Sequence, residues 1–341
     1  MHHRNPFPLL LLLAMASGNA FAWQESDFPP RPVVAYLFEL DAADPSTVVG
    51  NPKGYTFAKG DTLYDVARHL GLGINEVTDA YPDLDRWIPP EGESVPFPTW
   101  WVLPESDAQG VVVNIPEMRL YYFPSSAPRG PRTVITYPVG LGRDDWRTPT
   151  GKFRVTEKTV DPTWVIPDSI RDEHLRERGD PRKVIPGGDP ANPLGHYRMR
   201  LSLPLYGIHG TNIPWGVGME VSHGCIRLYP EDIERLFAIV PVGSPGEILY
   251  QPVKIGARDG EIYVEAHQDI YSTGLDYLEA ARSILRRKGW ESLVDRGRLA
   301  EALQSRAGMP TAVSQGRPLL RHPDPGPAEA QQGRDGPRPR S

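Results

Sequence analysis

Four apolar residues in the first third of the chain have the spacing i, i+3, i+4, i+7: Leu63, Val66, Ala67 and Leu70. This spacing is typical of an amphipathic helix that turns one face to a core. Asp61 or Thr62 can cap this helix at its start, and Gly71 can end it. The pattern further predicts a second helix over residues 74–80 and a strand that ends near Val95.

The period of the pattern changes between about residues 110 and 250. Three apolar, β-branched runs separated by Pro, Ser and Gly are predicted as strands: 111–115, 120–123 and 133–139. Over residues 196–203 apolar residues alternate with polar ones, as in a half-buried strand: Tyr197, Met199, Leu201 and Leu203. A helix with Pro230 in its first turn carries apolar residues on one face: Ile233, Leu236, Phe237 and Val240. This part is predicted to be mostly β, with one short helix.

The first residues of the chain have the pattern of a secretory signal peptide. A polar, basic start is followed by the apolar run Leu9 to Ala16 and by Ala20-Phe21-Ala22, an A-x-A cleavage pattern. A membrane anchor is the alternative, but the run is well short of the ~20 residues that a spanning helix needs. We therefore expect cleavage after Ala22 and export, with the mature protein in the periplasm.

The remaining segments complete the predicted organisation. Residues 23–50 are rich in Pro and Asp, residues 261–265 indicate an appended strand followed by two helices, and little apolar sequence follows Leu320. The chain is therefore predicted to consist of a signal peptide (1–22), an irregular segment (23–50), a small α+β domain (51–105), a mostly β domain (110–250), a C-terminal helical extension (251–306) and a disordered tail (307–341).

The most informative feature of the composition is the single cysteine, Cys225. The formal net charge of −6 comes without a basic stripe that would indicate a nucleic-acid partner. One cysteine excludes an internal disulfide, and an unpaired thiol in an exported protein is exposed to oxidation. We therefore expect Cys225 to serve chemistry rather than packing.

Two short segments surround this cysteine with groups suited to catalysis: Ile208-His209-Gly210 and Ser222-His223-Gly224-Cys225-Ile226-Arg227. A free thiol has a pKa near ~8.5, so a nearby imidazole is needed to take its proton. Both His209 and His223 are candidates for this base. The backbone N–H groups of Gly224 and Cys225 are candidates for an oxyanion hole.

These segments resemble the signature of the L,D-transpeptidases, whose catalytic domain is called YkuD-type. The likeness extends over about 110–250 and includes Gly140-Leu141-Gly142, Arg147-Thr148-Pro149-Thr150-Gly151 and Asn192-Pro193-Leu194-Gly195. The resemblance implies a β-sandwich-like domain with a mixed sheet. It also implies Cys225 as nucleophile and His209 as proton acceptor and donor, with the Gly210 carbonyl holding the His209 tautomer. His223 and Gly224 would shape the oxyanion site. Ser222 and Arg227 would support the loop.

The reaction that the resemblance implies is acyl transfer in the bacterial cell wall. Cys225 would attack a tetrapeptide stem of peptidoglycan, release D-Ala and form a thioester. An amine acceptor, either another stem peptide or the lysine of an outer-membrane lipoprotein, would then resolve the thioester, or water would hydrolyse it. No metal, organic cofactor or ATP is expected, because the thioester conserves the energy.

Residues 55–67, Y-T-F-A-K-G-D-T-L-Y-D-V-A, resemble the first half of a LysM domain. Such βααβ modules bind the glycan of peptidoglycan or chitin. The second half departs from the pattern, since Ala80-Tyr81-Pro82 stands where an Asn-Pro is common. Residues 51–105 are therefore either a glycan-binding module or a structural spacer.

Two other classes of function are open alternatives. His209, His223 and Cys225 could be zinc ligands, since three protein ligands with an open position are common in catalytic zinc sites. A protein that only binds the wall, with a degenerate catalytic domain, is the second alternative, and the intact Cys225 and His209 argue against it.

The other histidines and two tryptophans are expected to have no role in the chemistry. His196 lies on the polar side of its strand and is expected to be non-catalytic. His174 and His267 have no partner in the sequence pattern and are expected at the surface. Trp164 and Trp215 are expected to pack rather than to bind substrate.

Overall fold

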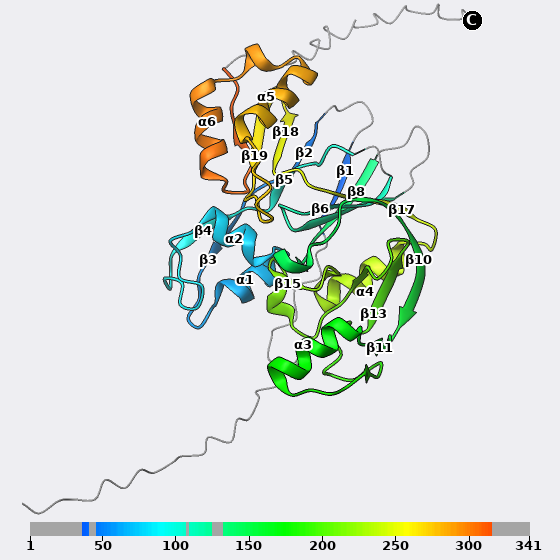
Figure 1. Cartoon of the computed structure of the whole chain (residues 1–341). Coiled ribbons are helices and arrows are strands. Elements are labelled where there is room, and N and C mark those ends of the chain that lie inside the picture. Colours follow the sequence, from blue (N-terminus) through cyan, green and yellow to red (C-terminus); the bar gives the residue numbers. More distant parts are fainter. Residues whose placement is uncertain (1–35, 41–45, 107–108, 125–131, 316–341) are drawn as a thin grey trace, which may run out of the picture. The chain divides into compact units, whose positions relative to one another are not determined.

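The computed structural model describes residues 36–40, 46–106, 109–124 and 132–315 (Figure 1). All of these residues belong to a single structural unit, which begins after residue 30. The predicted signal peptide and its cleavage after Ala22 lie outside the described residues. No helix among the described residues combines the length and the apolar character needed to cross a membrane.

Of the strands that the structure describes, nine form one mixed sheet. Most neighbours are antiparallel, while β6 pairs with β17, and β14 with β16, in parallel. The order across the sheet is β1 (Tyr36–Leu40), β8 (Arg132–Pro138), β7 (Arg119–Phe123), β6 (Gly110–Asn114), β17 (Pro245–Leu249), β10 (Gly151–Val160), β13 (Tyr197–Leu201), β14 (Gly207–His209) and β16 (Ile226–Arg227). The predicted mostly β class with a mixed sheet is confirmed.

Strand β6 is buried on both faces. Val111 and Val113 belong to the core that includes Ile233 and Leu236 of helix α4 (Pro230–Ile239). Val112 belongs to a second core together with residues of helices α1 (Leu63–Leu70) and α2 (Ile74–Ala80). Burial on both faces explains why this strand is a continuous apolar run instead of an alternating one.

Helices α1 and α2 have the bounds that the sequence predicts, because their ends are set locally. The Thr62 side chain accepts a hydrogen bond from the Asp65 N–H, and Gly71 ends α1 with a φ of 69°. Strands β3 (Lys53–Thr56) and β4 (Ser94–Phe97) pair antiparallel, and the two helices lie between them in the sequence, in the order β3, α1, α2, β4. The short strands β2 (Val48–Gly50) and β5 (Trp100–Val102), which precede and follow them in the sequence, also pair antiparallel.

The prediction that residues 23–50 are irregular is wrong for the described residues. Strand β1 pairs with β8 at the edge of the large sheet. Its alternating burial, with Tyr36 and Leu40 buried and Leu37 exposed, is the pattern of a sheet edge with one covered face. The Pro-rich and Asp-rich residues around it concealed this short strand.

After residue 250 the chain forms a smaller sheet and two helices. The sheet contains β18 (Val253–Arg258), β19 (Glu261–Ala266) and β20 (Thr311–Ala312). Helices α5 (Tyr277–Lys288) and α6 (Arg296–Ser305), joined through η4 (Glu291–Leu293), share a core with β18 and β19. Since β20 extends this sheet, the predicted disorder does not begin at residue 307, and residues 316–341 lie outside the described residues.

Short elements surround the strands that carry the candidate site. They are β9 (Leu141–Gly142), η2 (Asp144–Trp146), β11 (Trp164–Val165), α3 (Asp168–Arg178), β12 (Val184–Ile185), η3 (Pro214–Gly216) and β15 (Glu220–Ser222). Trp164 packs, as expected, against a small apolar cluster of Ile166, Ile170 and Ile185. The expectation that His174 is at the surface is wrong, because α3 buries this ring beside Trp164.

Candidate active site

Three neighbouring strands place charged and catalytic side chains on one side of the sheet. Arg198 of β13 is paired with His209 of β14, and His209 is paired in turn with Arg227 of β16. The neighbour of each of these residues along its strand points to the other side of the sheet, into the core: Met199, Ile208 and Ile226. Since side chains alternate along a strand, the register alone brings Arg198, His209 and Arg227 together.

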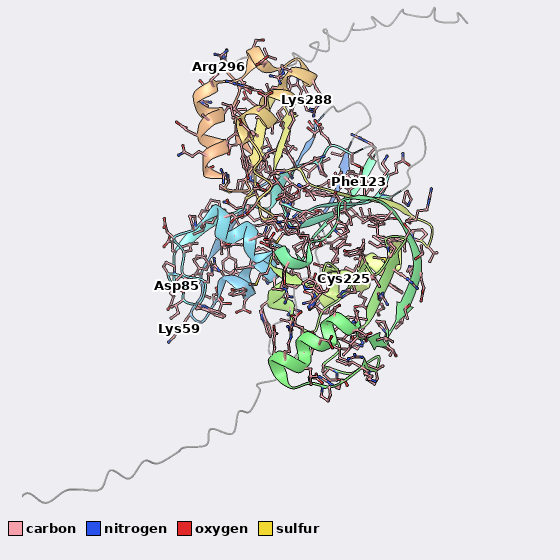
Figure 2. All side chains as sticks on the ribbon, viewed as in Figure 1. Lys59, Asp85, Phe123, Cys225, Lys288 and Arg296 are labelled. Atoms are coloured by element: carbon pink, nitrogen blue, oxygen red, sulfur yellow. The ribbon has the colours of Figure 1, made fainter. Side chains whose placement is uncertain are left out.

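Cys225 immediately precedes β16 and is partly exposed (Figure 2). Its position two residues before Arg227 puts it on the same side as His209. The sulfur lies 3.8 Å from the Leu205 carbonyl oxygen. Burial of the sulfur raises the pKa of the thiol, and this rise is opposed by a hydrogen bond from the Gly207 backbone and by the charges of nearby arginines. The resting state of Cys225 is therefore a thiol.

His209 is buried, with 2% of its surface exposed. Its Nδ1–H donates a 2.7 Å hydrogen bond to the Gly210 carbonyl, which leaves Nε2 as the acceptor. Burial, and then the charges of Arg227 and Arg198, lower the pKa of His209 to about 3, although the bond to Gly210 opposes them. The imidazole is therefore neutral at neutral pH.

The loop before Cys225 is held by Ser222. Its Oγ donates to the Cys225 carbonyl at 2.7 Å and accepts from the Gly224 N–H at 3.1 Å. The loop needs glycine at 224, where φ is 98° and a Cβ would lie 2.5 Å from the Tyr206 ring. In this structure the Gly224 N–H, predicted to contribute to an oxyanion hole, donates to Ser222 Oγ. The Cys225 N–H is the remaining candidate.

The His223 imidazole is directed to α3 instead of the oxyanion site. Its Nε2 lies 3.0 Å from Glu173, and its ring meets Trp146 edge-on at 5.3 Å. Glu173 also pairs with Arg143 at 2.9 Å. Hydrogen bonds from Arg143, and then from His223, hold the pKa of Glu173 at about 2, although partial burial opposes them. His223 thus connects the cysteine loop to α3.

A pocket of about 670 Å³ lies between α3 and η2, on the His223 side of the loop. Its lining is mainly charged and includes Arg143, Glu173 and Arg176 together with Trp146. The pocket therefore borders the cysteine loop through the Glu173–His223 contact.

A buried brace that the sequence interpretation missed reaches the cysteine loop from beyond residue 250. The Tyr271 hydroxyl donates to the Gly142 carbonyl at 2.9 Å and accepts from the Thr148 N–H at 3.0 Å. The Thr148 hydroxyl donates to the Gly224 carbonyl at 3.0 Å. Thr148 lies in one of the segments that resemble the L,D-transpeptidases, so the sequence could have indicated a role for it. No sequence signal indicates Tyr271.

The other residues singled out in the sequence lie away from this chemistry. His196 is exposed and 2.7 Å from Asp161, in agreement with a non-catalytic role. Trp215 is half-buried in η3.

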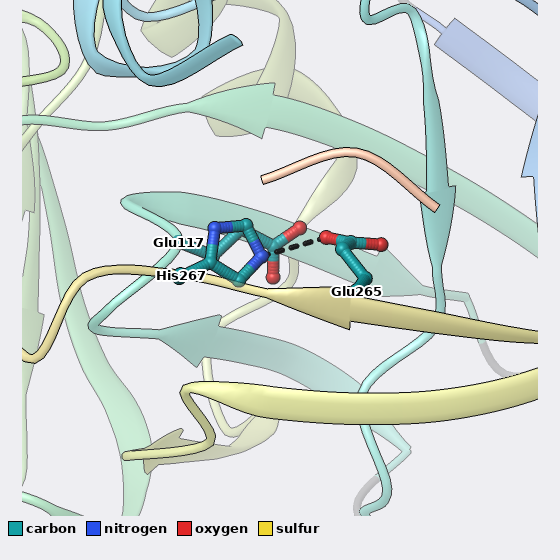
Figure 3. Close-up of side chains that lie close together, drawn as sticks. All are labelled: Glu117, Glu265 and His267. Atoms are coloured by element: carbon teal, nitrogen blue, oxygen red, sulfur yellow. Dashed lines mark hydrogen bonds and ion pairs between the residues drawn. The ribbon is translucent and has the colours of Figure 1, made fainter. Parts of the chain in front are cut away.

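Among the described residues, one group brings three possible metal-binding side chains together: Glu117, Glu265 and His267. The group is buried, and His267 faces the Glu265 carboxylate at 2.7 Å (Figure 3). The expectation that His267 is a surface residue is therefore wrong. The Lys254 ammonium lies 2.8 Å from Glu117 and 2.7 Å from Glu265, so a cation already occupies this cluster.

The zinc alternative receives no support from the geometry. In the part of the chain that the structure describes, the ligand atoms of His209, His223 and Cys225 do not converge as a group of three. The His223 Nε2 atom lies 3.0 Å from Glu173.

The chain was compared with family models, with curated proteins and with solved structures. Residues 108–255 match the family model for the L,D-transpeptidase catalytic domain, YkuD. "Probable L,D-transpeptidase ErfK/SrfK" of Salmonella typhimurium is 35% identical over 81% of this chain and 90% of its own length. "Probable L,D-transpeptidase YbiS" of Escherichia coli is 34% identical over 80% and 90%. The NMR structure of the Enterococcus faecium L,D-transpeptidase catalytic domain is 19% identical over 43% of this chain and 100% of that chain, with a TM-score of 0.32.

Proposed function

The chain belongs to the L,D-transpeptidase family, and we propose that it transfers acyl groups from peptidoglycan stem peptides through a thioester on Cys225. One observation carries this mechanism: the only cysteine of the chain lies on the same side of the sheet as a buried, neutral His209. The Nε2 atom of this imidazole is available to take the thiol proton as the sulfur attacks. Cys225 is the nucleophile, and His209 is the proton acceptor and donor.

In the first step the Cys225 sulfur attacks the carbonyl of the L-centre of diaminopimelate in a tetrapeptide stem. The thiol proton moves to His209 Nε2, and the Cys225 N–H donates to the developing oxyanion. The C–N bond to the terminal D-Ala then breaks, and the leaving nitrogen takes the proton from His209. The products are free D-Ala and a Cys225 thioester.

In the second step an acceptor amine attacks the thioester. His209 takes a proton from the attacking nitrogen and returns it to the departing Cys225 sulfur, so the enzyme regains its initial state. Another stem peptide and the lysine of a lipoprotein are the proposed acceptors, and attack by water would instead release the shortened stem. No metal or organic cofactor takes part, so activity should survive a chelator and be lost on thiol alkylation.

The mass of the purified protein after incubation with tetrapeptide or pentapeptide stems tests this proposal. We expect the tetrapeptide to acylate Cys225 with release of one D-Ala. The pentapeptide should react poorly, because its extra residue displaces a terminal carboxylate, and burying a misplaced charge is costly. Acylation by the pentapeptide alone would contradict the donor assignment. Mass spectrometry of wall fragments treated with the protein would then identify the acceptor.

For residues 51–105 we propose binding to peptidoglycan glycan, as in a LysM domain. The order β3, α1, α2, β4 and an aromatic pair at the surface support this: the Tyr64 and Trp87 rings are 5.0 Å apart, and Trp87 is 67% exposed. Since this part shares its core with β6 to β8, the test uses the full chain. Trp87→Ala should weaken sedimentation with insoluble peptidoglycan while Cys225→Ser should not, and equal binding of both variants would favour a spacer.

We further propose that the protein is exported to the periplasm with cleavage after Ala22. The order of basic start, apolar run and A-x-A pattern supports this. N-terminal sequencing of the protein recovered from cells should begin at Trp23, and an intact Met1 would contradict it.

A further inference from the structure

Two guanidinium groups flank the catalytic pair. Arg198 and Arg227 lie on the strands on either side of β14, each paired in register with His209. The charges of both arginines act on the His209 imidazole and on the Cys225 thiol. Both guanidinium groups therefore lie close to the atoms that react.

The absence of a side chain at Gly207 leaves room for the Arg198 side chain beside the cysteine. A Cβ at position 207 would lie 3.5 Å from Arg198 Nε and 3.9 Å from its Cγ, so the Arg198 side chain lies against the bare Gly207 backbone. The N–H of the same glycine is the donor to the Cys225 sulfur. The Arg198 side chain thus passes along the residue that contacts the nucleophile.

The two arginines differ from others of the chain in their partners. Arg119, Arg143 and Arg200 each pair with a carboxylate, of Glu76, Glu173 and Glu157 respectively. No carboxylate of the described residues pairs with Arg198 or Arg227. Moreover, the Nε of Arg227 is buried without a hydrogen-bond partner. A buried guanidinium nitrogen left unsatisfied is costly, so Arg227 is suited to bind an oxygen ligand at this position.

We propose that Arg198 and Arg227 together bind the terminal carboxylate of the donor stem peptide, and that Arg198 makes the site select donors with this free acid. The inference rests on the proposed function, because the leaving D-Ala of a tetrapeptide carries that carboxylate. A planar guanidinium binds a carboxylate through paired hydrogen bonds. With the carboxylate held there, the scissile carbonyl is one residue away, beside Cys225.

Binding of the carboxylate also helps the base. Burial, and then the charges of Arg227 and Arg198, lower the pKa of His209. A donor carboxylate bound between them offsets their charge, so the imidazole becomes a better proton acceptor only when the donor is in place.

The test compares two donors, a tetrapeptide with a free C-terminal acid and the same tetrapeptide with a C-terminal amide. The initial rate of Cys225 acylation is followed by intact mass. We expect Arg198→Gln to slow acylation by the acid ~10- to 100-fold, the size of a charge-assisted hydrogen bond, and to change acylation by the amide much less, so that the ratio of the acid rate to the amide rate falls. Arg198→Lys keeps the charge and should restore part of the preference for the acid. Arg200→Gln is the matched control, because Arg200 lies on the same side of β13 but is exposed, and both rates should be unchanged.

A misfolded variant would lose both rates, so the melting temperature of each variant is measured as well. An Arg198→Gln variant that keeps the melting temperature and slows both donors equally would overturn the inference, as would an Arg200→Gln variant with the same loss of acid preference. Equal rates of acid and amide with the unaltered protein would overturn it too. Absence of any acylation of the unaltered protein by either donor would overturn the proposed function and the inference with it.

Discussion

Replacing Tyr271 by phenylalanine removes one hydroxyl and two buried hydrogen bonds, those to the Gly142 carbonyl and from the Thr148 N–H. Tyr271 is buried, with 3% of its surface exposed, so water cannot replace the lost partners without rearrangement. An unsatisfied buried donor or acceptor costs about 1 to 3 kcal/mol. The free energy of unfolding should therefore fall by ~2–6 kcal/mol.

The same substitution should slow the chemistry, because Thr148 connects Tyr271 to the Gly224 carbonyl. Loosening this connection lets the Cys225 loop move, and small misplacements of a nucleophile are costly in rate. We expect kcat of acylation to fall ~10-fold or more, with little change in KM. Thr148→Val removes the hydroxyl that donates to the Gly224 carbonyl and accepts from the Gly142 N–H, and it should reproduce the fall in kcat.

Tyr122→Phe is the matched control. The Tyr122 hydroxyl donates a single bond to the Ile239 carbonyl, at the end of α4 and outside the brace, so this variant should lose about 1 kcal/mol and keep its kcat. The assays are denaturant unfolding and acylation of Cys225 followed by mass. A Tyr271→Phe variant with lowered stability and unchanged kcat would refute the reasoning, since the brace would then serve the fold alone.

Three further predictions concern the catalytic pair. Cys225→Ser should abolish acyl transfer with an unchanged melting temperature, because an alcohol is a far weaker nucleophile than a thiol; turnover near the original rate would contradict this. His209→Ala should lower the acylation rate ~10²–10⁴-fold and His223→Ala less, since His223 binds Glu173; the reverse order in the same assay would exchange their roles. The pKa of His209, lowered to about 3, lies below its ordinary value near ~6.5, so the stability it contributes is present above pH 6.5 and is lost as pH falls toward 3. His209→Gln should therefore reduce the fall in unfolding free energy between pH 7 and 5, by up to about 1.4 kcal/mol per pH unit, in urea titrations, and an unchanged slope would argue against the low pKa.

Elements with local signals were predicted from the sequence to the residue. The bounds of α1 and α2 follow from the Thr62 cap, the Gly71 end and the apolar spacing, none of which depends on distant residues. The edge strand β1 was missed, because its formation depends on β8, far along the chain. A short segment whose composition differs little from that of its neighbours gives no sequence signal of pairing with a distant strand.

The sequence predicted the reacting groups of the candidate site but not the residues that position them. Cys225 and His209 are recognised by residue type and spacing, and the structure brings them to one side of the sheet. Arg198 joins them only through the register of β13 with β14, which the sequence does not state. Likewise, whether the Gly224 N–H is free depends on the rotamer of Ser222, which claims it.

His267 shows a related difficulty. A single histidine after a strand gives no sign of its partners, which come from β19, from β18 and from the turn before β7. Burial of a charged cluster requires that each member be paired, and here Lys254 pairs with both glutamates. Such clusters become visible only once the strands are placed.

The electrostatics of the site differ from those of a base held by a carboxylate. In a triad the carboxylate orients the imidazole and stabilises the imidazolium, whereas the Gly210 carbonyl orients His209 without a full negative charge. The two neighbouring arginines oppose protonation of His209, and burial keeps Cys225 as a thiol. Because the thiolate is the form that oxidants attack, a catalytic pair that stays neutral until an anionic donor arrives protects its cysteine between turnovers. For a protein that we propose to be exported with an unpaired thiol, this arrangement joins protection of the nucleophile to selection of the substrate.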